Sequence, residues 1–279
     1  MLVEKRITGG CLELRDLVYS SMQWNEKYIR ERMWKNNMTD RKVGLLGRLP
    51  AQRPQGLHML SFYQHNPLPK APDSVAVPAV ADWGMLGNDK YGDCTFAGIA
   101  HAEMAIAQVL GLTEPGPTTD QVVKAYLSFT NGQDVGAVEA NLLKFWQQNE
   151  IFSGKVAAYA PTDPADHDEL KSIIAAYGLV YIGIEVPAPC ERQFAEHKPW
   201  ALTNTPADDN ILGGHCIILV GYDKDYVYGI TWGKVQAIEW NWLLSYMQES
   251  WAIIAPEIVT KGQYGQLRLA ELLADIEQL

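Results

Sequence analysis

The spacing of hydrophobic residues changes along the chain from a helical pattern to a strand pattern. Up to residue 177 apolar residues recur mostly at helical spacing, and beyond it they gather in short runs rich in β-branched and aromatic residues. We predict one amphipathic helix or two short ones over residues 12–34, and helices over residues 94–110, 119–130, 138–149, 166–177, 242–249 and 267–279. We predict strands over residues 179–186, 215–222, 226–232, 235–240 and 251–255. A helical half followed by a sheet half indicates an α+β fold rather than alternating βαβ units.

The stretch from residue 47 to residue 79 differs from its surroundings, because it carries six prolines and no sustained periodicity. Such a composition is typical of an extended connector. We therefore divide the chain into an N-terminal helical arm with its connector (residues 1–66), a main domain (residues 67–260) and a C-terminal helix (residues 261–279).

Charge is distributed unevenly between the arm and the body. Residues 1–54 hold eleven Lys/Arg and six Asp/Glu, whereas residues 55–279 hold twelve Lys/Arg and 27 Asp/Glu. The net charge of the whole chain is −10. A basic arm on an acidic body suggests two surfaces with different roles. The arm either docks on an acidic protein partner or is a solvated leader that folds back on its own body. The acidic body argues against nucleic-acid binding by the main domain.

Several classes of protein are excluded by what the sequence lacks. The longest apolar stretches fall far short of the roughly 20 residues that span a bilayer, and the N-terminus has no apolar leader. We therefore expect a protein that is made and kept in the cytoplasm, or packaged from it. The four cysteines form no CxxC pair, and no glycine-rich phosphate loop occurs. No metal and no cofactor are expected.

Cys94 is the first candidate for chemistry, because it begins the helix predicted over residues 94–110. A helix N-terminus stabilises a thiolate, which is the nucleophilic form of cysteine. The preceding loop, residues 87–93, contains two glycines and Asn88, so it can direct backbone N–H groups and one amide side chain toward a common point. That is the geometry of an oxyanion hole. A buried structural thiol is the alternative interpretation.

His215 is the second candidate, because it follows two glycines and heads an apolar strand. A general base must lie at such an edge to reach both a thiol and a substrate. A core histidine whose hydrogen bonds are satisfied within the fold is the alternative. His101, two turns after Cys94, and Cys216, on the opposite strand face from His215, are better explained as core residues.

Three motifs together resemble the papain-like cysteine peptidase superfamily in their chain order. They are Cys94 at the head of a helix, His215 in GGHCIILVGYD, and Trp232 in ITWG. The resemblance covers residues 75–258 and implies a central Cys-headed helix packed on an antiparallel sheet or barrel. More narrowly, WGMLGNDKYGDCTFAGIAH and TWGKVQ resemble a group of uncharacterised papain-like proteins of bacteria and their phages.

The resemblance implies a thiol hydrolase of peptide or amide bonds, with Cys94 as nucleophile and His215 as base and acid. Asn88 lies six residues before the cysteine, where the family has Gln, and would help to build the oxyanion hole. The residues expected to bind substrate are Tyr91, Gly92, Gly214 and Trp232.

One position departs from the family pattern. Two residues before the Trp-Gly pair the family has an Asn that orients the histidine, whereas this chain has Ile230. An isoleucine cannot hydrogen-bond an imidazole, so either another group orients His215 or the dyad is unsupported. The chain is therefore either an active enzyme or a catalytically weak or inactive papain-like component of a phage virion or similar assembly, docked through residues 1–66. In a third interpretation, the arm is an inhibitory pro-segment that covers the cleft.

Overall fold

A six-stranded antiparallel sheet organises the part of the chain that the structure describes. The structure is a computed structural model that describes residues 43–112, 115–257 and 267–279, and Arg41–Leu279 form one unit. The strands lie in the order β1-β6-β2-β3-β4-β5, and every neighbouring pair is antiparallel. Their bounds are Ala158–Pro161 (β1), Val180–Pro187 (β2), Ile211–Tyr222 (β3), Tyr226–Thr231 (β4), Lys234–Glu239 (β5) and Met247–Ile254 (β6). The α+β class with an antiparallel sheet is confirmed.

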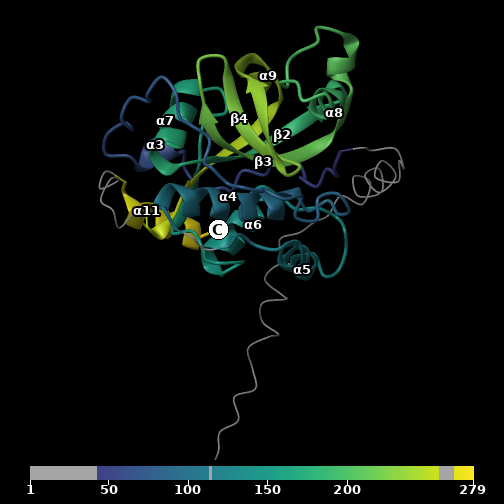
Figure 1. Ribbon diagram of the computed structural model, residues 1–279. Helices are drawn as coiled ribbons and strands as arrows, with labels where there is room; N and C mark the ends of the chain where they lie inside the picture. Colours follow the sequence, from purple (N-terminus) through teal and green to yellow (C-terminus); the bar gives the residue numbers. More distant parts are fainter. Residues whose placement is uncertain (1–42, 113–114, 258–266) are drawn as a thin grey trace, which may run out of the picture. The chain divides into compact units, whose positions relative to one another are not determined.

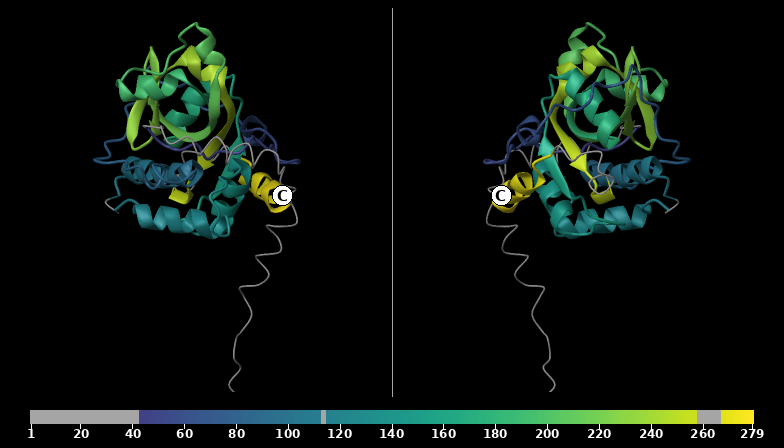
Figure 2. Two further views of the ribbon diagram at one scale, coloured as in Figure 1. Left: turned by 90° about the vertical axis from the view of Figure 1, so that its right-hand side faces the viewer. Right: turned by 90° about the vertical axis from the view of Figure 1, so that its left-hand side faces the viewer.

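The helices divide between two regions of this unit. Figure 1 shows α4, α5, α6 and α11 together on one side, with α7, α8 and α9 beside the strands, and Figure 2 shows the same separation from two further directions. The bounds are Leu60–Tyr63 (α3), Cys94–Leu110 (α4), Thr119–Phe129 (α5), Glu139–Gln148 (α6), His167–Tyr177 (α7), Pro189–Ala195 (α8), Pro206–Asp209 (η1), Trp240–Tyr246 (α9) and Leu269–Glu277 (α11). The helical arm predicted over residues 12–34 lies outside the described residues. Among the described helices, none is both long and apolar enough to cross a bilayer.

Element boundaries follow the hydrophobic pattern closely in the long helices. The helix predicted over residues 94–110 has those bounds, and the strand predicted over residues 226–232 ends at Thr231. The prediction is wrong at the starts of β3 and β6, which begin four residues earlier than predicted, so His215 lies within β3 and not at its head. It is also wrong at the helix over residues 242–249, because α9 ends at Tyr246 and the chain continues directly into β6. The hydrophobic pattern does not predict α3, α8 or β1. Each has only four to seven residues, too few to show a period.

The proline-rich connector is irregular apart from α3, and it packs against the rest of the unit. Leu60 and Tyr63 are buried, and the Tyr63 hydroxyl donates to the carboxylate of Asp275 in α11 at 2.6 Å. Further along, the backbone N–H and C=O of Val75 pair with those of Tyr222 at the end of β3. The connector therefore contacts both a helix and the sheet.

Helix α4 packs closely on the sheet because its sequence is rich in small residues. A β-carbon on Gly98 would lie 3.0 Å from the sulfur of Cys216 and 3.0 Å from the ring of Tyr181, so a larger residue would push the helix away from the sheet. The Tyr181 hydroxyl donates to the carbonyl oxygen of Thr95 at 2.7 Å. This buried hydrogen bond joins the sheet to the first turn of α4, one residue from Cys94.

Replacing Tyr181 by Phe is expected to lower the free energy of unfolding by about 0.5–1.5 kcal/mol, because it removes a buried hydrogen bond and keeps the ring. Tyr159→Phe is the matched control, since the Tyr159 hydroxyl is buried with no hydrogen-bond partner among the described residues. That control should leave the stability unchanged or raise it. Urea unfolding followed by circular dichroism measures both variants, and equal losses would contradict the role given to the Tyr181 bond.

Candidate active site

Cys94 is the first residue of α4, so its sulfur lies at the positive end of the helix. Asp93 occupies the N-cap position, although its side chain makes no capping hydrogen bond. Cys94 is 1% exposed, and the backbone N–H of Gly47 donates to its sulfur at 3.2 Å. The helix N-terminus and this N–H both favour negative charge on the sulfur.

His215 lies in β3 and is held in one orientation by two neighbours. Its Nε2 lies 2.8 Å from the hydroxyl oxygen of Thr231, and its ring stacks on Trp232 with the centroids 5.0 Å apart. Its Nδ1 is buried and has no hydrogen-bond partner among the described residues. His215 and Cys94 line the same small hollow. The contacts to Nε2 therefore leave Nδ1 available to exchange a proton.

Thr231 supplies the orienting contact that Ile230 cannot make. Ile230 stands opposite Ile218 in the ladder between β3 and β4. Because side chains alternate between the faces of a strand, these two isoleucines lie on the face opposite to His215, whereas Thr231 shares its face. Of the two alternatives that Ile230 left open, the geometry favours orientation of His215 by another group, a hydroxyl one residue further along.

Trp232 is held over His215 by the tight turn between β4 and β5. Trp232 and Gly233 form its two-residue loop, with φ of +44° and +72°. Two left-handed residues in such a loop match the twist of an antiparallel hairpin. A β-carbon on Gly233 would also lie 2.9 Å from the backbone of Gly84. The Trp-Gly pair is thus explained by the turn as well as by the site.

Asn88 lies in the loop before α4 and is 2% exposed. Its Nδ2 donates to the carbonyl oxygen of Leu45 at 3.0 Å and to that of Tyr91 at 3.1 Å. Leu45 belongs to a segment that crosses the site, so the amide already holds a main-chain carbonyl from another part of the chain. An oxyanion donor must do the same for the carbonyl oxygen of a substrate.

An extended segment of the chain itself, residues 44–49, lies across the site, and we call it the cleft segment. Its backbone is hydrogen-bonded to both walls of a cleft, as in the addition of a strand. The bonds run from Leu45 N to Asn88 O (2.7 Å), Ala137 N to Gly47 O (3.0 Å), Arg48 N to Gly214 O (3.2 Å) and Leu49 N to Ala137 O (2.9 Å). The space left beside Cys94 and His215 is about 10 Å³, no more than one water molecule needs.

Two glycines allow the cleft segment to lie this deep. A β-carbon on Gly47 would collide with the carbonyl oxygen of Gly92, and one on Gly44 would collide with the indole of Trp232. Each glycine therefore brings the backbone into contact with a wall that a side chain would keep at a distance.

The site residues assigned from the sequence come together around this cleft. The carbonyl oxygens of Gly92 and Gly214 face the cleft segment. The carbonyl oxygen of Tyr91 accepts a hydrogen bond from Asn88, and the indole of Trp232 stacks on His215.

Four further residues shape the site without being predicted from the sequence: Arg48, Asp134, Ala137 and Thr231. Asp134 accepts the N–H of Gly92 at 2.9 Å and the hydroxyl of Tyr126 at 2.6 Å, which fixes one wall. Arg48, Asp134 and Ala137 contact partners far away in sequence, so no local pattern marks them. Thr231 is the exception, because strand alternation could have suggested it.

Burial keeps the site largely uncharged in this closed state. Burial and the nearby positive charge of Arg48 lower the pKa of His215 to about 3, so its imidazole is neutral at pH 7. Burial raises the pKa of Asp93 to about 8, so this carboxyl is mostly protonated at the same pH. Neither group then places a full charge beside the sulfur of Cys94.

His101 and Cys216 have the core positions expected for them. The Nε2 of His101 contacts the carbonyl oxygens of Trp83 and Gly84 at 2.9 and 3.1 Å, and burial lowers the pKa of this imidazole to about 4. Cys216 is buried against Gly98 of α4. His101 therefore anchors the loop before the cysteine and is not the base.

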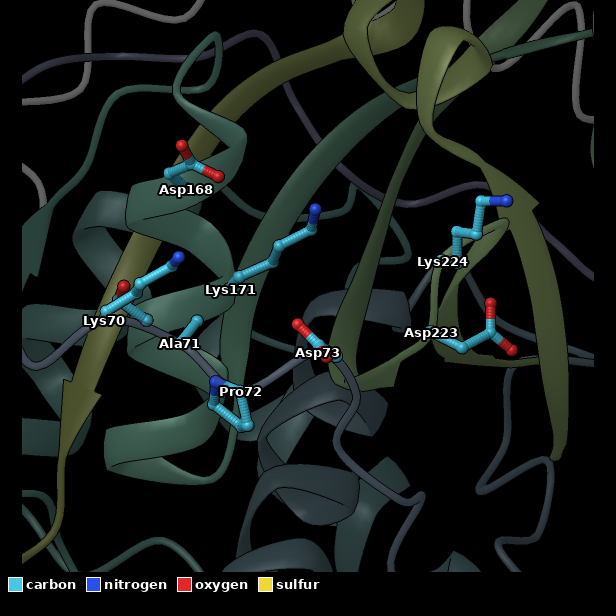
Figure 3. A pocket seen from close by; sticks show the side chains of 9 residues that line it. Lys70, Ala71, Pro72, Asp73, Asp168, Lys171, Asp223 and Lys224 are labelled. Atoms are coloured by element: carbon cyan, nitrogen blue, oxygen red, sulfur yellow. The ribbon is translucent and has the colours of Figure 1, made fainter.

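A wider hollow of about 690 Å³ lies away from this cleft and shares no lining residue with the Cys94 hollow. Figure 3 shows side chains of both charge signs around it, from the connector, α7 and the β3–β4 turn. They include Lys70, Asp73, Asp168, Lys171, Asp223 and Lys224. No Cys or His lines it, and nowhere in the described ranges do three or more His, Cys, Asp or Glu residues gather to hold a metal ion. The candidate chemistry therefore belongs to the cleft.

Comparison with solved structures finds similar folds among cysteine proteases. Xylellain, a cysteine protease from Xylella fastidiosa, matches over 78% of this chain and 98% of its own, with a TM-score of 0.55 and 15% identity. A second match is to the cysteine protease and lectin-like domains of Cwp84, a surface layer associated protein of Clostridium difficile. It covers 83% of this chain and 59% of the Cwp84 chain, with a TM-score of 0.52 and 12% identity. Digestive procathepsin L 3 of the Tenebrio molitor larval midgut matches over 86% of this chain and 91% of its own, with a TM-score of 0.50 and 14% identity.

No protein-family model and no curated protein matches this sequence. At identities this low the structural likeness is one of fold. What the cleft does must therefore be argued from its own geometry.

Gly47→Val is expected to displace the cleft segment, because the new side chain cannot share the space of the Gly92 carbonyl. Cys94 should then react with iodoacetamide at least about tenfold faster than in the unaltered chain at the same pH, since local opening limits access to buried groups. Gly154→Val is the matched control, because a β-carbon there meets no atom within 4 Å. Mass spectrometry of the Cys94 peptide measures the rates. Equal rates in the Gly47 variant and the unaltered chain would show that the segment does not shield the sulfur.

Proposed function

We propose that this chain, which has the fold of the papain-like cysteine proteases, is a thiol hydrolase of peptide or amide bonds. The observation that carries the proposal is the main chain of the cleft segment, held as extended peptide across Cys94 with one carbonyl on the amide of Asn88. A peptide-binding cleft with a cysteine at a helix N-terminus and an oriented histidine has the parts that such hydrolysis needs.

Cys94 is the nucleophile in the proposed reaction. Its sulfur bonds to the carbonyl carbon of the substrate, Nδ1 of His215 takes the thiol proton, and the C=O electron pair moves onto oxygen. The Nδ2 of Asn88 and the backbone N–H of Cys94 stabilise that oxyanion. When the intermediate collapses, the C–N bond breaks and His215 gives its proton to the departing amine. Water deprotonated by His215 then cleaves the thioester and releases the acid.

We also propose that the described structure is a latent form of the enzyme. The cleft segment presents the N–H of Gly47, rather than a carbonyl carbon, to the sulfur of Cys94, so the segment is not placed for attack. It also fills the space that a substrate would need. This geometry supports the interpretation of the N-terminal region as an inhibitory pro-segment, and a procathepsin is among the proteins of similar fold. Displacement or removal of the cleft segment would activate the enzyme.

The main argument for the alternative function, an inactive component of a phage virion or similar assembly, is weakened by the structure. It depended on Ile230, and Thr231 makes the contact to His215 instead. The basic arm through which such a component would dock lies mostly outside the described residues. A peptide substrate is therefore the partner that the cleft favours.

Full-length Gly47→Val is expected to cleave fluorescently labelled casein at least about 100-fold faster than the same variant with Cys94→Ala, because alanine offers no nucleophile. Cys190→Ala in the Gly47→Val background is the matched control, since Cys190 is a buried cysteine outside the cleft. Release of labelled peptides measures all three. Cleavage that persists without the Cys94 sulfur would refute the assignment.

Acid is expected to loosen the cleft segment. With the segment in place the pKa of His215 is about 3, and loss of burial and of the Arg48 charge would raise it toward its ordinary 6.5. The open state then binds more protons between these values, so opening becomes more favourable by up to about tenfold per pH unit below 6.5. Hydrogen exchange of the Gly47 and Arg48 amides, corrected for intrinsic rates, should show less protection at pH 5 than at pH 7. Amides of α7 should be equally protected at both pH values. Protection of the cleft segment that does not depend on pH would contradict the link between opening and protonation of His215.

A further inference from the structure

Arg48, the residue after Gly47 in the cleft segment, extends its side chain into a closed acidic pocket. Arg48 is 3% exposed, and its Nη1 lies 2.8 Å from Oε1 of Glu249 in β6. The same nitrogen donates to the carbonyl oxygen of Leu49 at 3.2 Å. A guanidinium buried this deeply needs an anionic partner, because an unpaired charge is costly to remove from water.

Glu139, in the first turn of α6, belongs to the same pocket. It is fully buried, and neither of its carboxyl oxygens has a conventional hydrogen-bond partner among the described residues. The Nε of Arg48 is likewise buried without a partner there. Burial and the charge of Glu249 raise the pKa of Glu139 well above its ordinary value, which favours the neutral form of this carboxyl beside the ion pair. The pocket therefore still holds polar groups that a differently placed guanidinium could satisfy.

Gly183 in β2 makes room for the arginine side chain. It pairs with Cys216 of β3 and Glu249 of β6, so it lies on the floor of the pocket. A β-carbon on Gly183 would lie 2.6 Å from Cδ of Arg48 and 2.8 Å from a carboxyl oxygen of Glu139. Any larger residue would close this path. Both the shape of the pocket and its acidic groups therefore suit a long cationic side chain.

We propose that this pocket, formed by Glu139, Gly183 and Glu249, selects arginine in the substrate, and that Arg48 holds the place of that arginine in the latent form. The inference rests on the hydrolytic function proposed for the same cleft. When the cleft segment leaves, Glu249 is left buried without a counter-charge, so a substrate cation restores the pair. Arg48 follows directly on the residue that contacts the Cys94 sulfur, so the pocket lies close to the bond to be cleaved.

The geometry also indicates which side of the cleaved bond the arginine occupies. Gly44, on one side of Gly47, contacts the indole of Trp232, and the pocket lies on the other side. His215 stacks on Trp232 and must protonate the departing amine, so the pocket belongs to the acyl side. Arginine should exceed lysine there, because its planar guanidinium can donate to Glu249 and to a carbonyl oxygen together.

The test uses the full-length Gly47→Val chain and fluorogenic peptide amides with arginine, citrulline or leucine at the first, second or third position before the cleaved bond. Citrulline keeps the shape of arginine and removes its charge. At one of these positions arginine should exceed citrulline in kcat/KM by at least about tenfold, as expected for a hydrogen bond to a charged group. Glu249→Gln should reduce that ratio to near one, whereas Glu150→Gln, an exposed matched control, should keep it. Equal cleavage of the arginine and citrulline peptides at all three positions would overturn the inference.

A binding measurement separates this inference from the proposed function. The full-length Gly47→Val chain with Cys94→Ala is titrated with a fluorescent peptide of the sequence of residues 43–50, and with its citrulline analogue. The arginine peptide should bind at least about tenfold more tightly by fluorescence anisotropy. If no peptide is cleaved but the arginine peptide binds more tightly, the proposed hydrolysis is wrong and the arginine selectivity of the pocket is supported. If the two peptides bind equally, the proposed selectivity of the pocket is wrong. Gly44→Val provides a second way to displace the segment if Gly47→Val does not fold.

Discussion

The close packing of α4 on the antiparallel sheet is the constraint on which the rest of this structure depends. Gly98 allows the helix to approach β3, and the hydrogen bond from Tyr181 to Thr95 fixes the first turn of the helix. The sulfur of Cys94 therefore lies at a rigid helix end, beside the strand that carries His215. The catalytic pair proposed here comes from distant parts of the sequence and would need such rigid supports, because small displacements of either member would remove the reaction geometry.

The cleft segment shows how the same chain can close its own site. Its backbone bonds to both walls, two glycines bring it against Gly92 and Trp232, and one arginine pairs with a buried carboxylate. Each contribution favours the closed state without placing a carbonyl carbon at the sulfur. Because closure also keeps His215 neutral, the closed and open states differ in bound protons as well as in contacts.

Latency and selectivity share one set of groups in the function proposed here. A buried carboxylate such as Glu249 is stable only with a cation or a proton beside it. In the latent form that cation is Arg48, and in the working form it would be a substrate arginine. An enzyme that uses one pocket for both purposes must release its own arginine before it can select another. Under this proposal, the strength of the Arg48–Glu249 pair would govern both the onset of activity and the choice of substrate.

The sequence by itself determined the class of fold, the long helices and strands, and the placement of Cys94, His215 and Asn88 in elements suited to chemistry. These features are local, because helical and strand periods, caps and glycine-rich turns are visible within a few residues. Tertiary structure alone decided that residues 44–49 fill the cleft and that Arg48 meets Glu249. Strand alternation could place Thr231 on the face of His215, but only the tertiary structure showed that the two side chains are in contact. In the sequence Thr231 reads as an ordinary strand residue and Arg48 as one charge among eleven in a basic arm. The physical reason is that hydrogen bonding, close approach and ion pairing act between atoms adjacent in space, and local sequence patterns carry no record of which distant segments the fold brings together.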